Sequence, residues 1–155
     1  MERVTDRFNR VVIADDDPDH SLLFRIVLKQ VDASKELVIV HDGPELMELL
    51  QYTLPDILFL DLNMPCKNGY DCLEEIRQDP RLCQLPVVVY SSSSDITEIR
   101  KCFEHQADLY MVKAFNSIHL TNALESILKL DWWNTSSSGQ RYYFMNNRFV
   151  PYTAD

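Results

Sequence analysis

Five short apolar runs recur along the chain, each four or five residues long and rich in valine, isoleucine or leucine. Polar residues interrupt them rarely, which is typical of parallel strands that are buried on both faces. We therefore predict strands at Arg10–Ala14, Glu36–Val40, Asp56–Leu60, Pro86–Tyr90 and Leu109–Val112.

The segments between these runs carry apolar residues at helical spacing. In the last of them, Leu120, Leu124, Ile127 and Leu128 follow the pattern i, i+4, i+7, i+8, which places them on one face of a helix. The same periodicity predicts helices over Pro18–Val31, Pro44–Gln51, Gly69–Gln78, Asp95–His105 and Ser117–Leu130.

Strand and helix thus alternate five times within residues 8–130. Such alternation predicts an α/β fold in which helices cover both faces of a parallel sheet. Because crossover connections are right-handed, the natural topology is a doubly wound, five-stranded parallel sheet. We expect residues 8–130 to form one domain.

Residues 131–155 form a C-terminal extension of different character, too short for a second domain. Two interpretations stay open: the extension folds back on its own domain and covers the last helix, or it makes a dimer or partner contact. Both rest on its aromatic residues, which are Trp132, Trp133, Tyr142, Tyr143, Phe144 and Phe149.

Charge and composition narrow the classes of function. The chain has 24 acidic residues against 15 Lys and Arg, a formal charge of −9, which argues against nucleic acid as a direct partner. No apolar run is long enough to span a membrane, and Met1–Arg10 lacks the apolar core of a secretory signal. The four cysteines contain no CxxC pair. We therefore expect a cytoplasmic protein with free thiols.

Polar residues stand where four of the predicted strands end: Asp15 and Asp16, Asp61, Ser91, and Lys113. The carboxyl ends of parallel strands meet at one edge of a sheet, so these side chains should converge. Clustered carboxylates favour a hard divalent cation such as Mg²⁺. A carboxylate can then attack phosphorus while the lysine neutralises the phosphoryl oxygens. The pattern predicts a site that captures a phosphoryl group on an aspartate.

Over residues 8–130 the chain resembles the CheY-like receiver domains of two-component response regulators, a family with the flavodoxin-like fold. Asp15 and Asp16 match the acidic pair of that family, and Asp61 matches its phosphoacceptor. The resemblance implies that Asp16 and Asp61 bind Mg²⁺ directly. It also implies that Asp15 binds the ion through water and Asn63 through its backbone carbonyl.

The resemblance also assigns roles to residues of the fourth and fifth strands. Ser91 matches the switch hydroxyl, Tyr110 the switch aromatic and Lys113 the lysine that contacts the phosphoryl group. Two positions depart from the family pattern. Ala114 stands where a proline with a cis bond is usual; a cis bond before alanine would cost about 3 kcal/mol, so we expect a trans bond and a displaced lysine. Gln106 replaces the usual glycine, which predicts a stiffer turn.

The resemblance implies a stand-alone response regulator rather than an enzyme, although one that assists its own phosphorylation and dephosphorylation. Its partners would be a sensor histidine kinase or a phosphotransfer protein, and its output a protein contact or a relay. A homodimer is expected through the C-terminal extension or through the face of the fourth helix, fifth strand and fifth helix.

Several alternatives remain open. Ser91 is also compatible with a plain loop residue, Lys113 with a surface charge and Tyr110 with ordinary packing. The whole domain is compatible with a pseudo-receiver that serves only as a scaffold. An aspartate-nucleophile phosphatase of the haloacid dehalogenase type is disfavoured, because Asn63 stands where those enzymes need a second acid.

Overall fold

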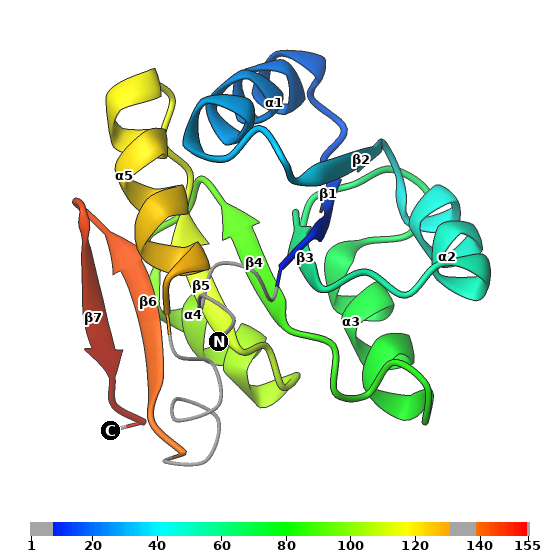
Figure 1. Ribbon diagram of the computed structural model, residues 1–155. Coiled ribbons are helices and arrows are strands. Elements are labelled where there is room, and N and C mark those ends of the chain that lie inside the picture. Colours follow the sequence, from blue (N-terminus) through cyan, green and yellow to red (C-terminus); the bar gives the residue numbers. More distant parts are fainter. Residues whose placement is uncertain (1–7, 131–138, 155) are drawn as a thin grey trace, which may run out of the picture.

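The computed structural model describes residues 8–130 and 139–154 (Figure 1). All five predicted strands are present within one residue of the expected bounds. The C-terminal extension adds two more. The strands are β1 (Arg10–Ala14), β2 (Glu36–Val40), β3 (Ile57–Leu60), β4 (Val87–Ser91), β5 (Leu109–Val112), β6 (Arg141–Met145) and β7 (Arg148–Tyr152).

The strands form one sheet in the order β2-β1-β3-β4-β5-β6-β7. The first five are parallel, as predicted, and β6 continues the sheet parallel to β5. β7 then returns antiparallel to β6. The five-stranded parallel sheet is therefore confirmed, and a hairpin that the pattern did not predict widens it at the β5 edge.

Five helices cover the sheet on both faces, which confirms the doubly wound architecture. Apolar side chains of α1 and α5 pack on one face, and those of α2, α3 and α4 on the other (Figure 1). Successive strand residues alternate between these two cores; in β1, Val11 and Ile13 face α1 and α5, while Val12 faces the opposite layer. The helices are α1 (Pro18–Val31), α2 (Gly43–Tyr52), α3 (Gly69–Gln78), α4 (Ile96–Glu104) and α5 (Ser117–Leu128).

Short polar side chains begin the helices next to the site-bearing loops. The Asp17 side chain accepts hydrogen bonds from the backbone N–H groups of Asp19 and His20, and this N-cap starts α1. Asn116 caps α5 in the same way. The caps fix where each loop after a strand ends and its helix begins.

The C-terminal hairpin folds back onto its own domain. Its turn residues Asn146 and Asn147 have φ of 53° and 63°, a left-handed conformation that suits a two-residue hairpin turn. Phe144 of β6 is 3% exposed and packs in the core beneath α5. On the other face, the rings of Phe103 in α4 and Tyr152 in β7 lie 4.9 Å apart. The hairpin therefore lies between α4 and α5, at the edge of β5. Trp132 and Trp133, the other aromatics of the extension, lie outside the described residues.

The two departures near β5 have different outcomes. The part of the chain described here contains no cis peptide bond, so the bond between Lys113 and Ala114 is trans, as expected. Gln106 adopts φ of 69°, the left-handed conformation that glycine favours. Arg77 reinforces this turn, because its guanidinium donates to the carbonyl of Gln106 at 2.8 Å and to the carboxylate of Asp108 at 2.9 Å.

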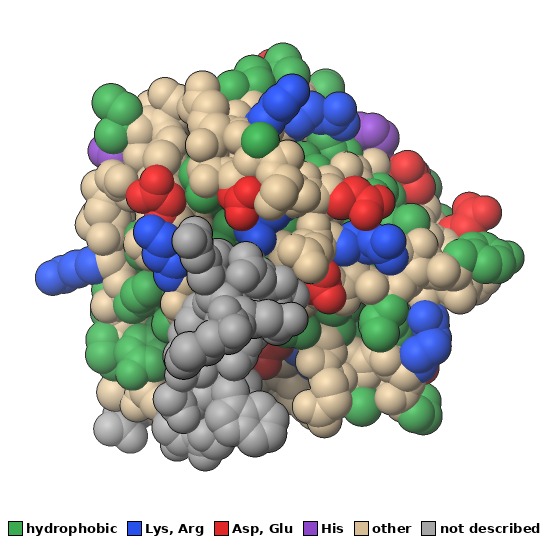
Figure 2. Space-filling model, in the orientation of Figure 1, with side chains coloured by type: hydrophobic (Ala, Val, Ile, Leu, Met, Phe, Trp, Pro, Cys, Tyr) green, Lys and Arg blue, Asp and Glu red, His purple; other side chains and the backbone are tan. Residues whose placement is uncertain are grey.

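Acidic and basic side chains are interspersed over the face shown in Figure 2, so no extended basic surface crosses it. None of the helices within residues 8–130 and 139–154 has the length and apolar character that a bilayer crossing requires.

Candidate functional site

Three acidic side chains converge at the carboxyl edge of the sheet. Asp15 follows β1 and Asp61 follows β3, and both are buried, while Asp16 is exposed. Backbone hydrogen bonds continue the strand pairing into these loops, since the N–H of Asp61 donates to the carbonyl of Ala14 at 2.9 Å and that of Asp15 to Val40 at 3.0 Å. One oxygen atom from each of the three carboxylates lies within 4.8 Å of the other two. The pairing of β1 with β3 thus assembles the cluster.

Lys113, at the end of β5, reaches into this cluster. Its Nζ donates to Oδ2 of Asp15 at 2.9 Å and to Oδ2 of Asp61 at 3.1 Å, and its side chain is 5% exposed. The ammonium also lies 5.0 Å from the centre of the Tyr90 ring. Its backbone N–H pairs with the carbonyl of Ser91 at 2.7 Å, which continues the pairing of β4 with β5. The trans bond before Ala114 therefore leaves the lysine in contact with the carboxylates.

Burial dominates the electrostatics of Asp61. It raises the pKa of this carboxyl, and the neighbouring Asp15 raises it further. The N–H of Asn63, which donates to Oδ1 at 3.1 Å, and the ammonium of Lys113 lower the pKa. The net direction is upward, so additional positive charge at this site would favour the ionised carboxylate.

The donor set fits a hard divalent cation. Three carboxylates and one ammonium leave the cluster with an excess of negative charge, and its ligand atoms are all oxygen. Small oxygen-rich sites of this kind suit Mg²⁺ or Mn²⁺.

Ser91 and Tyr110 lie next to this cluster and do not join it. Ser91, the last residue of β4, is 1% exposed, and its Oγ accepts a hydrogen bond from the N–H of Ser93 at 3.2 Å. Tyr110 is fully buried, and its hydroxyl donates to the carbonyl of Ser93 at 2.7 Å. Burial raises the pKa of Tyr110 to about 12, so it stays a donor at neutral pH. The loop after β4 is thus tied both to Ser91 and to the aromatic residue of β5.

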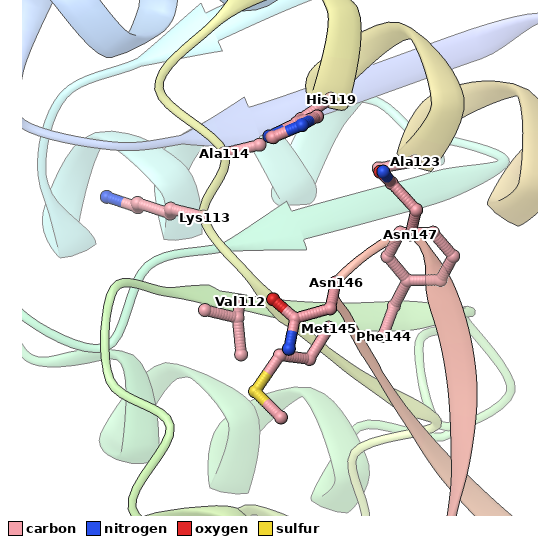
Figure 3. Close-up of a pocket in the computed structure, with 9 residues that line it drawn as sticks. All are labelled: Val112, Lys113, Ala114, His119, Ala123, Phe144, Met145, Asn146 and Asn147. Atoms are coloured by element: carbon pink, nitrogen blue, oxygen red, sulfur yellow. The ribbon is translucent and has the colours of Figure 1, made fainter.

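The hairpin turn borders the loop that carries Lys113. Figure 3 shows the lysine side chain extending away from Met145 and Asn146, so its ammonium and the hairpin lie on opposite sides of the loop. A cavity of about 120 Å³ separates loop and hairpin. It is lined by Val112, Lys113, Ala114, His119, Ala123, Phe144, Met145, Asn146 and Asn147.

Sequence reasoning missed three residues around Lys113. The Tyr90 ring lies beside its ammonium, and His20 Nδ1 lies 3.3 Å from its Nζ. The Phe115 ring packs against His20 with the ring centroids 5.0 Å apart. A signal for His20 was available, because it is the third residue after the N-cap Asp17 and therefore faces back toward the loop after β1.

Comparison with known proteins agrees with this geometry. Residues 11–125 match the family model described as the response regulator receiver domain. The response regulator Rcp1 of Synechocystis sp. is 32% identical over 124 residues, which cover 76% of this chain and 84% of Rcp1. The transcriptional regulatory protein CpxR of Escherichia coli is 30% identical over 126 residues, and this chain spans about half of its length.

Solved structures give the same result for the fold. The Mn²⁺-bound form of Rcp1 superposes with a TM-score of 0.70 at 31% identity, covering 77% of this chain and 91% of Rcp1. The phosphorylated cyanobacterial phytochrome response regulator RcpA superposes with a TM-score of 0.73 at 30% identity, covering 83% of this chain and 96% of RcpA. The fold is thus the flavodoxin-like fold of CheY-like proteins, and the chain belongs to the response regulator receiver domain family.

Proposed function

We propose that this chain is a stand-alone response regulator that accepts a phosphoryl group on Asp61 in a Mg²⁺-dependent reaction. The observation that carries the proposal is the ammonium of Lys113, which lies between Asp15 and Asp61 inside a cluster of three carboxylates. A surface charge would not be buried in this way.

The side chains divide the chemistry between them. A carboxylate oxygen of Asp61 forms a bond to phosphorus while the bond from phosphorus to the histidine nitrogen of the donor breaks, and Lys113 neutralises the oxygens of the transferring group. The hydroxyl of Ser91 is placed at the end of β4 to hydrogen-bond the product. Asp16, Asp61 and the Asn63 carbonyl would hold Mg²⁺, with Asp15 contributing through water, and the bound ion would supply positive charge that screens the nucleophile from the phosphoryl oxygens. The same arrangement assists hydrolysis of the aspartyl phosphate.

The relatives support the choice of chemistry. One solved relative is described as Mn²⁺-bound and another as phosphorylated. Receiver domains take their phosphoryl group from phosphohistidine, so the partner upstream is a sensor histidine kinase or a phosphotransfer protein. Both would meet the chain in the cytoplasm.

The output is a protein contact or a relay. Tyr110 is hydrogen-bonded to the loop that follows Ser91, so a change at Ser91 reaches β5 and its neighbours α4 and α5. At this edge a partner would meet the β6–β7 hairpin. Its partly exposed apolar side chains, among them Tyr143 and Val150, also support a homodimer through the extension.

The test is intact mass spectrometry after incubation with a small phosphodonor, with and without Mg²⁺. The wild-type chain should gain one phosphoryl group only when Mg²⁺ is present, and Asp61→Asn should gain none. Asp71→Asn, an exposed carboxylate in the first turn of α3, is the matched control and should behave as wild type.

No mass gain in the wild type, together with no Mg²⁺ binding, would favour the pseudo-receiver scaffold. A gain that persists in Asp61→Asn would place the acceptor elsewhere.

A further inference from the structure

We propose that His20 is a positioning residue that holds the ammonium of Lys113 in its reactive orientation. This inference rests on the proposed function, because Lys113 matters to the reaction only if Asp61 accepts the phosphoryl group. The observation behind it is the 3.3 Å separation between His20 Nδ1 and Lys113 Nζ, next to the contact that the ammonium makes with Oδ2 of Asp15.

An ammonium has three N–H donors and no acceptor. Two of those of Lys113 go to Asp15 at 2.9 Å and Asp61 at 3.1 Å. His20 Nδ1 accepts the third. Each of the three N–H groups then has an acceptor, so three contacts instead of two hold the long lysine side chain in place.

The contact requires a particular tautomer of His20. Nδ1 can accept from an ammonium only if the ring proton is on Nε2. Nε2 lies 3.5 Å from Oδ2 of Asp17, which favours a proton there. Nδ1 lies 3.6 Å from Oδ2 of Asp15, but that oxygen already accepts a hydrogen bond from the ammonium of Lys113. Oδ1 of Asp17 is already used as the N-cap of α1, since it accepts from the N–H of Asp19 at 2.9 Å. Oδ1 of Asp17 therefore caps α1, while Oδ2 orients the imidazole of His20.

Packing holds the ring in place. The rings of His20 and Phe115 lie 5.0 Å apart at 46°, and Phe115 is only two residues beyond Lys113. Ala114 lies between Lys113 and Phe115 in the sequence, at the position where the family has proline. A loop without that proline has more backbone freedom. His20 contacts both ends of the segment from Lys113 to Phe115, because its Nδ1 meets Lys113 and its ring packs against Phe115. These two contacts restrain the loop.

The kinetic test measures the rate of phosphorylation by a small phosphodonor in saturating Mg²⁺. His20→Ala should lower that rate about tenfold, the loss expected for a hydrogen bond to a charged group. His20→Asn should restore most of it, because its Oδ1 takes the position of Nδ1. Leu22→Ala, an exposed change on the same helix, is the control and should leave the rate unchanged.

A double-mutant cycle shows whether His20 acts through Lys113. In a Lys113→Met background, His20→Ala should cause no further loss. A further tenfold loss in that background, or failure of His20→Asn to restore the rate, would overturn the proposal.

A second measurement does not depend on phosphorylation. The ¹⁵N shifts of the His20 ring at about pH 8 should show the proton on Nε2 in the wild type. A proton on Nδ1 would rule out the contact with Lys113. If the wild-type chain takes up no phosphoryl group, the proposed function fails, while these shifts still decide whether His20 contacts the lysine.

Discussion

At the scale of single residues, the site is assembled at a cost in stability. Asp15 and Asp61 are both buried, and each must share the single ammonium of Lys113. Taking carboxylates out of water is unfavourable unless their charges are matched. The upward shift in the pKa of Asp61 shows that the match is incomplete. At sites of this kind, the buried charges that activity requires lower the stability of the folded protein.

We therefore predict that Asp61→Asn stabilises the protein at neutral pH by about 1 kcal/mol. Burial raises the pKa of Asp61 above its unfolded value. The protonated Asp61 carboxyl therefore contributes to the stability of the folded protein below the pKa of the unfolded chain. This contribution is lost as the pH rises through the pKa of Asp61 in the folded protein. The difference between variant and wild type should grow as the pH rises from about 4 and be small below that.

Urea denaturation without divalent cations, at a series of pH values, measures this difference. The exposed substitution Asp71→Asn should change the free energy of unfolding by less than about 0.5 kcal/mol. Equal stability of wild type and Asp61→Asn at pH 7 would contradict the prediction.

At the scale of elements, the turn into β5 departs most from the expected pattern. Gln106 holds a left-handed conformation at φ of 69°, which crowds the Cβ of any residue but glycine. Its N–H donates to the carbonyl of Phe103 at 3.0 Å and its carbonyl accepts from Arg77, so backbone contacts enforce the conformation. These hydrogen bonds maintain the left-handed conformation although a residue other than glycine occupies the position.

Gln106→Gly should therefore raise the free energy of unfolding by about 0.5–1 kcal/mol, because it removes this strain and leaves the backbone hydrogen bonds in place. Thermal denaturation followed by circular dichroism measures the change. Gln84→Gly, at a turn position without positive φ, should lower the melting temperature, because glycine adds conformational entropy to the unfolded chain. A lower melting temperature for Gln106→Gly would show that its side chain contributes more than the strain costs.

The sequence predicted most elements because their signals are local. Strands buried on both faces leave uninterrupted apolar runs such as Leu109–Val112, and helices leave a 3.6-residue period. Tyr142–Met145 is also an uninterrupted apolar run, and Asn146 and Asn147 follow it as a turn signal. What the sequence does not contain is where this strand pairs, because its place as β6 depends on an open edge at β5, far away in sequence. The acids and Lys113 could be predicted because each follows a strand. For His20 the sequence offers only its spacing from the N-cap Asp17; its contact with Lys113 could not be predicted, since it depends on residues far apart in sequence meeting in space.

At the scale of the whole molecule, the hairpin changes which surface the domain offers. It covers the edge of β5 and buries Phe144 beneath α5, while side chains such as Tyr143 and Val150 stay partly exposed. A second copy of the chain could bury them.

We predict that size-exclusion chromatography with light scattering shows a dimer that dissociates when residues 131–155 are deleted. The deletion also uncovers β5, so the sharper variant is Val150→Arg, which leaves the buried Phe144 in place and adds charge to β7. Its circular dichroism spectrum should match the wild type while its mass is that of a monomer. A wild-type chain that stays monomeric at high concentration would contradict the prediction.

The two added strands also decide how the sheet ends. All four residues of β5 are apolar. Without β6 and β7, β5 would present an unpaired backbone edge to which strands of other chains could hydrogen-bond. The outer strand is instead β7, where Pro151 supplies no N–H and Arg148 adds an exposed charge. Such an edge is a poor seed for aggregation. The hairpin therefore shields the backbone edge of β5 from pairing with strands of other chains.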